Sequence, residues 1–244
     1  MAGNHSFHFN AFLRALFLIF SAAIYTAILG ILAFASCLFD RSGRWPSFFQ
    51  RTWGKWLLRT NGIHVNAVGL EHLGKDRAYI LISNHASILD IPGIIAAIPL
   101  PVRFIAKRSL IWFPIFGWVL YLSGHILIDR ESSLSALKSL KRAVALMENG
   151  TCVIVFAEGT RSPDGQVKEF KRGAFLLALQ SKVPILPISI SGTFQMLPRH
   201  GWCFWPATIE IHVDKPIPTQ GIPLREIRPL IQRVRETIIQ NLKQ

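Results

Sequence analysis

A histidine and an aspartate, His85 and Asp90, are the first residues of this sequence that could do chemistry together. They follow directly after the short apolar run 79–82, which has the pattern of a strand buried on both faces. Such strands deliver functional groups at their carboxyl ends. A carboxylate beside one imidazole nitrogen fixes the tautomer and leaves the other nitrogen free to take a proton from a hydroxyl. The pair therefore predicts a general base delivered by a strand.

The backbone must turn between these two residues. On a regular helix, residues five apart are rotated by about 500°, or roughly 140° net, which would direct Asp90 away from His85. Ser87 offers a solution, because as a helix N-cap it would leave His85 in the loop and put Asp90 in the first helical turn. The alternative is purely structural: Ser87 and Asp90 fit a capping box that follows an ordinary loop histidine.

Composition favours a membrane surface or an anionic substrate as the partner. Of the 244 residues, 50% are hydrophobic, and 27 Lys and Arg against 14 Asp and Glu give a formal charge of +13. Nucleic-acid binders of this charge usually carry polar basic stripes, and the sequence has no zinc-finger, RNP or helix-turn-helix pattern. The three scattered cysteines suggest neither a disulfide framework nor a zinc site. We therefore expect no nucleic-acid partner and no metal.

Residues 1–60 are predicted as membrane-anchoring and interfacial helices. Residues 15–39 carry no charge and are long enough to cross a bilayer, which takes about 20 residues. The polar or small residues within them also allow a helix that bends or lies in one leaflet; they are Ser21, Tyr25, Thr26 and Gly30. Because cations are concentrated after this stretch, the positive-inside rule predicts that the rest of the chain lies on the cytoplasmic face of the plasma (inner) membrane. A second, interfacial helix with an aromatic belt is predicted from Trp45, Phe48, Phe49, Trp53 and Trp56.

Residues 61–244 are predicted as a single α/β domain with a mixed, largely parallel central sheet flanked by helices. Strands are predicted at 63–68, 79–82, 102–106, 126–129, 152–156, 185–190 and 208–213. Helices are predicted after His85, from Ser133 to the Asn149-Gly150 stop, over 173–179, and near the end with Ile227, Leu230, Val234 and Ile238 on one face.

Three stretches need a local interpretation. Residues 69–75 have the glycine and lysine spacing of a phosphate-binding loop, but no Ser or Thr follows the lysine, so we predict a hairpin turn joining the first two strands. The alternation in 208–213 is that of an edge-like strand. Residues 110–122 are very apolar yet broken by Pro114 and Gly117, and we expect them to pack against lipid or a fatty chain, with ordinary core as the alternative.

A second group of polar residues gathers where another buried strand ends. The strand predicted at 152–156 leads into Glu158, Gly159, Thr160 and Arg161. In open α/β sheets, sites lie at the carboxyl ends of the strands. Without further information, Glu158 and Arg161 could also form a salt bridge that stabilises a turn.

Four segments, taken together, resemble the blocks of the glycerolipid acyltransferase family, specifically the bacterial-type 1-acyl-sn-glycerol-3-phosphate acyltransferases. The segments are Asn84-His85-x4-Asp90, Lys107-x-Ser109-Leu110-x3-Pro114-x2-Gly117, Phe156-Ala157-Glu158-Gly159-Thr160-Arg161-Ser162, and Val183-Pro184 to Pro187 through Ser191-Gly192-Thr193. The resemblance covers roughly residues 60 to 215. Two positions depart from the family pattern: Ser109 stands where Glu is frequent, and Ala157 stands where Pro is frequent.

The resemblance implies acyl transfer to the free hydroxyl of lysophosphatidic acid, with His85 as the base and Asp90 orienting it. It implies that Lys107 and Arg161 bind the acceptor phosphate, that Glu158 binds the glycerol hydroxyl, and that Gly159 and Thr160 offer donors to the oxyanion. Asn84 is included among the predicted substrate-binding residues.

The donor implied is acyl-CoA or acyl-carrier protein, used as co-substrate without a bound cofactor. Since the chain has no GxSxG motif and no plausible Cys–His pair, we expect no covalent acyl-enzyme. Ser109 leaves the acceptor open, so lyso-ornithine lipid, another lysophospholipid or glycerol 3-phosphate are alternatives. A non-enzymatic basic protein that binds membrane or nucleic acid is the alternative of another class.

Overall fold

The structure is a computed structural model that describes residues 2–37, 39–40, 43–74, 77–113, 116–129, 142–148 and 150–242. Its centre is a seven-stranded sheet in the order β1-β7-β6-β2-β5-β3-β4. All neighbouring strands are parallel except β6 and β7, which are antiparallel. The strands are β1 (His64–Val68), β2 (Ile80–Ser83), β3 (Val102–Lys107), β4 (Ile126–Ile128), β5 (Cys152–Phe156), β6 (Ile185–Ser191) and β7 (Thr208–Val213).

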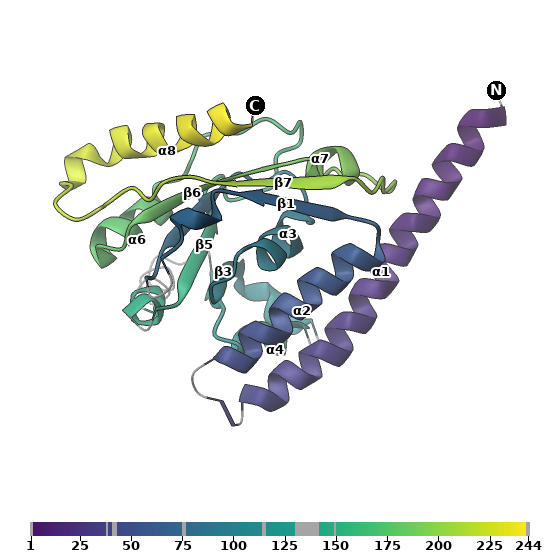
Figure 1. Ribbon diagram of the computed structural model, residues 1–244, viewed down its shortest axis with the longest axis horizontal. Helices are drawn as coiled ribbons and strands as arrows, with labels where there is room; N and C mark the ends of the chain where they lie inside the picture. The colour runs from purple at the N-terminus through teal and green to yellow at the C-terminus, as the bar shows by residue number, and fades with distance from the viewer. Residues whose placement is uncertain are drawn as a thin grey trace.

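Helices lie on both sides of this sheet (Figure 1). The α-helices are α1 (Ala2–Cys37), α2 (Arg44–Thr60), α3 (Asp90–Ala97), α4 (Phe116–Leu122), α6 (Gly173–Ser181), α7 (Thr193–Met196) and α8 (Ile227–Asn241). Short 3₁₀ turns are η1 (Leu70–His72), η2 (Arg108–Trp112) and η3 (Leu224–Glu226). Residues 142–148 are also helical, whereas the predicted start of that helix at Ser133 lies outside the described residues.

Each face of the sheet buries its own apolar cluster. In β2, Leu81 packs with α2 and α3, whereas Ile80 and Ile82 pack with α6 and α8 on the other face. This strand is buried on both sides, as parallel strands covered by helices are. The α8 face predicted from sequence is the one that packs inward: Ile227, Leu230, Val234 and Ile238 are all buried. The predicted fold class, mixed α/β with a largely parallel sheet, is confirmed.

Two predicted details of the sheet are wrong. The first two strands form no hairpin, because β7 and β6 lie between β1 and β2. Gly69 turns the chain across the end of β7 instead: its φ is +79°, and a Cβ there would lie 1.9 Å from the carbonyl oxygen of Val213. Strand β7 is also not an edge strand, since β1 pairs with its outer side. Its alternation reflects burial of one face only, which a strand inside a sheet can share.

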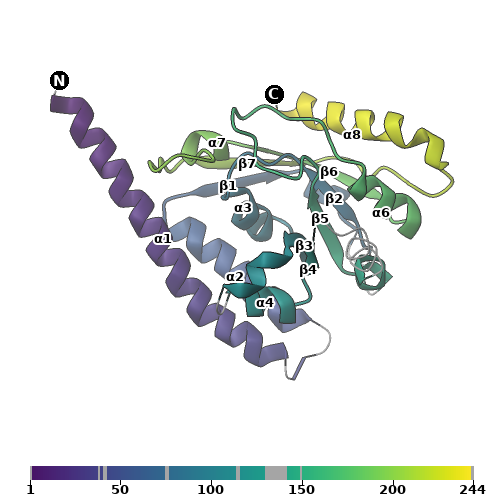
Figure 2. The ribbon, with the colours of Figure 1, turned by 180° about the vertical axis from the view of Figure 1, so that it is seen from behind.

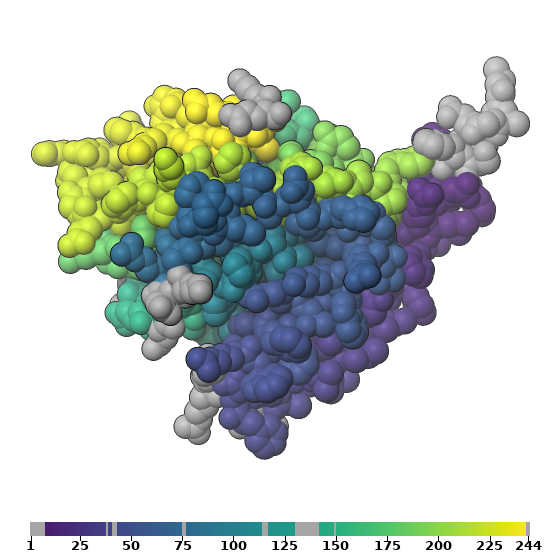
Figure 3. Space-filling model, in the orientation of Figure 1, coloured from purple at the N-terminus to yellow at the C-terminus, as the bar shows by residue number. Residues whose placement is uncertain are grey.

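The N-terminal helix packs along the body of the protein, against α2 and α4. Figure 3 shows α1 beside the surface of α2, and Figure 2 shows α4 from behind, in contact with α1. The polar residues of α1 face this contact: Tyr25 Oη hydrogen-bonds Thr60 Oγ1 (2.8 Å). Similarly, the Asn61 amide donates to Ser21 Oγ (2.9 Å). The polar interruptions of the apolar stretch are therefore explained by packing of α1 on α2.

By length and composition, His8–Cys37 is the single helix among the described residues that could cross a membrane. Many of its large apolar side chains point away from the protein and are exposed. They include Phe12, Leu16, Phe20, Ile24, Ile28 and Ile31. The division of the chain at residue 60 coincides with the end of α2, and its meaning as a domain boundary stays a prediction.

Candidate active site

His85 and Asp90 form a hydrogen-bonded pair at the carboxyl end of β2. The distance from His85 Nδ1 to Asp90 Oδ2 is 2.7 Å, and the Asp90 side chain is buried. Because a carboxylate can only accept, Nδ1 carries the proton and donates it, which leaves Nε2 as the proton acceptor. His85 Nε2 has no partner among the described residues, and the ring lines a cavity. The geometry is that of an oriented general base.

Asp90 also forms the turn that brings it back to the histidine. Its Oδ2 accepts the backbone N–H groups of Ala86 (2.8 Å) and Ser87 (2.9 Å). The predicted capping role of Ser87 is wrong: the N-cap of α3 is Leu89, with no side-chain cap. The Ser87 hydroxyl donates instead to the carbonyl of Leu197 (2.6 Å), which ties this loop to the segment after α7. Asp90 Oδ2 serves the amides of Ala86 and Ser87, whereas the N–H of Leu89 donates to Ser87 Oγ (3.3 Å).

The backbone of His85 is fixed by the loop that follows β5. Its N–H donates to Glu158 Oε1 (2.9 Å), and its carbonyl accepts the N–H of Ser162 (2.7 Å). The other Glu158 oxygen accepts the N–H of Lys168 (3.2 Å). Burial raises the pKa of Glu158, while the two backbone hydrogen bonds oppose that shift. Above the plane of the imidazole, the Phe156 ring stacks at 3.9 Å between centroids.

Asn84 and Glu158, both predicted to bind substrate, have their polar atoms engaged by the protein backbone. Asn84 donates to the carbonyl of Ile190 and accepts its N–H, both at 2.9 Å, which joins the end of β2 to β6. Neither residue lines the cavity. Glu158 also forms no ion pair with Arg161, so the salt bridge considered from sequence does not occur. Their assignment to substrate binding stays a prediction. The contacts that they make hold the backbone around His85 in place.

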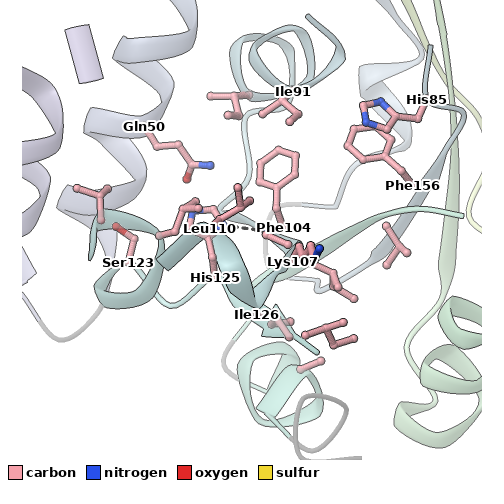
Figure 4. Close-up of a pocket in the computed structure, with 18 of the residues that line it drawn as sticks. Gln50, His85, Ile91, Phe104, Lys107, Leu110, Ser123, His125, Ile126 and Phe156 are labelled. Atoms are coloured by element: carbon pink, nitrogen blue, oxygen red, sulfur yellow. Dashed lines mark hydrogen bonds between the residues drawn. The ribbon is translucent and has the colours of Figure 1, made fainter. Parts of the chain in front are cut away.

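One large cavity of about 1020 Å³ adjoins the His85 ring (Figure 4). It extends beneath α1 and α2 and is lined mostly by apolar side chains, among them Ile91, Phe104 and Leu110. The predicted residues Lys107, Gly159, Thr160 and Arg161 also line it. The carboxyl ends of β3 and β5 are adjacent in the sheet, and this adjacency brings Lys107 and the 159–161 turn to one cavity.

Lys171 is a cavity residue that the sequence analysis missed. Its backbone N–H donates to the carbonyl of Ala157 (2.8 Å), and its side chain lies across Gly159. Gly159 has φ +74°, and a Cβ on it would lie 3.0–3.1 Å from three atoms of the lysine side chain. The positive φ favours glycine at this position, and the absence of a side chain lets the end of Lys171 lie against the turn. The signal in the sequence was a lysine just before the 173–179 helix, which by itself reads as an ordinary surface residue.

The two predicted oxyanion donors differ in availability. The N–H of Gly159 already donates to the carbonyl of Phe156 (3.0 Å). Thr160 lines the cavity, and its hydroxyl has no partner among the described residues. Within the same described part of the chain, no group of three or more His, Cys, Asp or Glu side chains is placed to hold a metal ion.

Comparison with known proteins identifies the family. A sequence model of the acyltransferase family matches residues 64–191, a range that contains both halves of the site. The chain belongs to the acyltransferase family. The predicted recognition is thereby confirmed, and the matched range agrees with the 60 to 215 over which the four segments were found.

Relatives of this acyltransferase carry a consistent name. Human 1-acyl-sn-glycerol-3-phosphate acyltransferase alpha is 35% identical over 179 residues, covering 73% of this chain and 63% of the relative. The yeast (Saccharomyces cerevisiae) 1-acyl-sn-glycerol-3-phosphate acyltransferase is 35% identical over 187 residues, covering 75% and 61%. The chain thus spans less than two thirds of the length of these curated relatives.

A solved structure matches over nearly the whole chain. The crystal structure of the 1-acyl-sn-glycerophosphate (LPA) acyltransferase PlsC from Thermotoga maritima has a TM-score of 0.83 and is 29% identical. The match covers 96% of this acyltransferase and 95% of that chain. The likeness in fold therefore extends well beyond the range of the family model.

Replacing Glu158 tests whether it positions the histidine. In Glu158→Gln, the amide offers one acceptor where the carboxylate offers two, so one buried backbone N–H loses its partner, which costs about 1–3 kcal/mol. We expect the thermal unfolding midpoint in detergent to fall by roughly 2–4 °C per kcal/mol. Glu169→Gln, at an exposed position, is the matched control. Equal midpoints for the two variants would contradict the positioning role.

Proposed function

We propose that this acyltransferase moves a fatty acyl group from an acyl thioester to the free sn-2 hydroxyl of lysophosphatidic acid, giving phosphatidic acid. The observation that carries this proposal is the free Nε2 of His85, oriented by Asp90, at a large apolar cavity that also contains Lys107 and Arg161. An apolar cavity suits acyl chains, and the two cations suit a phosphate. The names of the relatives support this choice of acceptor.

In the proposed reaction, Nε2 of His85 takes the proton from the acceptor hydroxyl as its oxygen attacks the thioester carbonyl. The imidazolium that forms is stabilised by Asp90, whose Oδ2 already holds two backbone N–H groups. When the tetrahedral intermediate collapses, the C–S bond breaks and the proton passes from the imidazolium to the leaving thiolate. Positioned general-base catalysis of this kind contributes about 10²–10⁴-fold.

The remaining predicted residues take distinct parts. Arg161 and Lys107 bind the phosphate, because a planar guanidinium and a compact ammonium both suit a dianion. The Thr160 hydroxyl donates a hydrogen bond to the oxyanion of the tetrahedral intermediate, because the N–H of Gly159 already donates to the carbonyl of Phe156. Glu158 and Asn84 act by holding the His85 loop to β5 and β6. Acyl-CoA and acyl-carrier protein both fit the proposal as donors, and no bound cofactor enters it.

The protein's own contacts bear on how α1 meets a membrane. Near its start, the carbonyl of Ala11 accepts the N–H of Phe204 (3.1 Å), and at its end Cys37 Sγ contacts the carbonyl of Leu122 (3.7 Å). Twenty-six residues of helix separate these two contacts, or about 39 Å, which exceeds the roughly 30 Å hydrocarbon core of a bilayer. A crossing helix would therefore require parts of one compact domain on opposite membrane faces.

We propose that α1 lies within one leaflet, with its exposed apolar side toward the lipid. The η2–α4 segment adds exposed aromatic residues on the same side of the molecule, namely Trp112 (83% exposed), Phe113 (60%) and Trp118 (54%). The bilayer is then a partner of the enzyme on the cytoplasmic face of the inner membrane, whose anionic lipids attract the cations that follow α1. The cavity lies directly under α1 and α2, where a lysolipid could enter it.

Acyl transfer in detergent tests the reaction. Wild type should transfer a labelled acyl group from acyl-CoA to lysophosphatidic acid, and His85→Ala should lose about 10²–10⁴-fold of the turnover. Asp90→Asn should lower kcat with little change in the KM of the acceptor, because Asp90 orients and stabilises the base. Transfer by His85→Ala at the wild-type rate would refute the mechanism. If wild type were inactive with acyl-CoA and with acyl-carrier protein on every lysolipid offered, the proposed function would be wrong.

Arg161→Ala tests phosphate recognition. It should raise the KM for lysophosphatidic acid by roughly tenfold or more, as loss of a charge-assisted hydrogen bond of about 1.5–3 kcal/mol predicts. A neutral monoacylglycerol acceptor should be affected much less. Arg172→Ala removes an exposed cation that does not line the cavity and serves as the control. Equal losses for charged and neutral acceptors would indicate a structural role for Arg161.

Two epitope tags test the leaflet proposal. With one tag before residue 1 and another after residue 244, protease added to sealed inner-membrane vesicles should reach both tags from the same side. That result is expected if α1 does not cross the bilayer. Detergent-permeabilised vesicles show that each tag can be cleaved at all. Tags on opposite sides would mean that α1 spans the membrane.

A further inference from the structure

The end of the cavity far from His85 carries several uncharged polar side chains. Gln50 from α2 and Ser123 and His125 from the segment after α4 gather there, as Figure 4 shows. Between them and His85 lie apolar side chains, among them Phe104 and Phe156. Polar groups placed at the far end of an apolar cavity fix the orientation and the identity of a ligand.

His125 at this end is buried and neutral, with one donor left over. The ring is 4% exposed, and its Nδ1 accepts the N–H of Phe104 (3.0 Å). Burial, together with the nearby positive charges of Arg103 and Arg142, lowers the pKa of His125 to about 3. Because Nδ1 is the acceptor, the single ring proton is on Nε2. That N–H has no hydrogen-bond partner among the described residues.

Gln50 supplies complementary groups. Its amide points into the cavity from α2 in Figure 4, and it too has no side-chain partner in the described part of the chain. The side chain therefore offers one carbonyl acceptor and one NH₂ donor to the cavity that His125 also lines. A saturated chain filling this end would leave these groups unpaired, at a cost of about 1–3 kcal/mol for each buried group.

Contacts between rings connect the far end to the catalytic histidine. The ring centroids of His85 and Phe156 are 3.9 Å apart, those of Phe156 and Phe104 are 6.4 Å apart, and those of Phe104 and His125 are 5.8 Å apart. Phe104 and Phe156 both line the cavity, as do the two histidines. A fatty chain with its carbonyl carbon at His85 would run along these rings and reach His125 partway along its length.

We propose that the far end of the cavity is a subsite for an oxygen function within the fatty acyl chain, and that this enzyme favours hydroxylated acyl chains. A hydroxyl group suits this end because it can accept from a donor such as His125 Nε2–H and donate to an acceptor such as the Gln50 carbonyl. The inference rests on the proposed function for the position of the chain. The competing outcome is that ordered water fills the subsite and that the enzyme binds a shorter saturated chain, which ends before reaching it.

Binding tests the subsite without catalysis. Oleic and ricinoleic acid differ by one mid-chain hydroxyl, and each is made to displace a fluorescent fatty acid from wild-type protein in detergent. Ricinoleic acid should bind more tightly. The ratio of the two Kd values should shift by roughly tenfold toward oleic acid in Gln50→Met, because that variant loses the hydrogen-bonding groups at nearly constant volume. His125→Asn, which keeps an acceptor near the N–H of Phe104, should shift the ratio in the same direction.

The control is Gln180→Met, at an exposed position of α6 outside the cavity. It should leave the ratio unchanged. Equal affinities of wild type for the two acids, or tighter binding of oleic acid, would overturn the subsite. So would a Gln50→Met variant with the wild-type ratio, which is the result expected if water fills the far end.

Transfer then separates the two proposals. Wild type should use ricinoleoyl-CoA with a higher kcat/KM than oleoyl-CoA, and Gln50→Met should reverse that order while retaining activity with oleoyl-CoA. Transfer of both chains with equal kcat/KM would refute the subsite but would still support the proposed function. Selective binding of ricinoleic acid with no transfer from any donor would support the subsite and refute the proposed function.

Discussion

The peptide unit of His85 is held between two groups from a single loop, the carboxylate of Glu158 at 2.9 Å and the N–H of Ser162 at 2.7 Å. This contact exists because β2 and β5 are parallel neighbours, so the loops after them emerge at the same edge of the sheet. One of these loops carries His85, the proposed base, and the other carries Thr160 and Arg161. The register of one strand pair therefore sets the relative position of the base and of the groups that face the same cavity.

Glu158, which joins the loops after β2 and β5, is buried. A carboxylate removed from water is costly, and its raised pKa reflects this cost. Its two backbone hydrogen bonds offset part of it. Asp90 is buried in the same way and is compensated by the imidazole and by two backbone amides. Both carboxylates stabilise a loop geometry that an apolar residue could not define, which ties the local fold to the chemistry.

The cavity couples this edge of the sheet to the N-terminal helices. It is lined by α1 and α2 on one side and by the ends of β3 and β5 on the other, so the helices that bear the exposed apolar surface also roof the cavity. The proposed reaction, which joins a membrane lipid to a water-soluble donor, needs such a shared boundary. Hydrogen bonds that join Tyr25 and Ser21 of α1 to Thr60 and Asn61 at the end of α2 hold these two helices together over the cavity.

The sequence by itself determined which elements form and which residues could react, because these depend on local pattern. The buried runs 79–82 and 152–156 predicted β2 and β5, and four apolar residues at helical spacing predicted the packed face of α8. The tertiary structure alone decided strand order, which excluded the hairpin and placed β7 inside the sheet. It also decided that Asn84 and Glu158 bind backbone, that Lys171 lies over Gly159, and that Gln50 and His125 share a cavity. Such contacts join positions far apart in the chain, so no local periodicity encodes them.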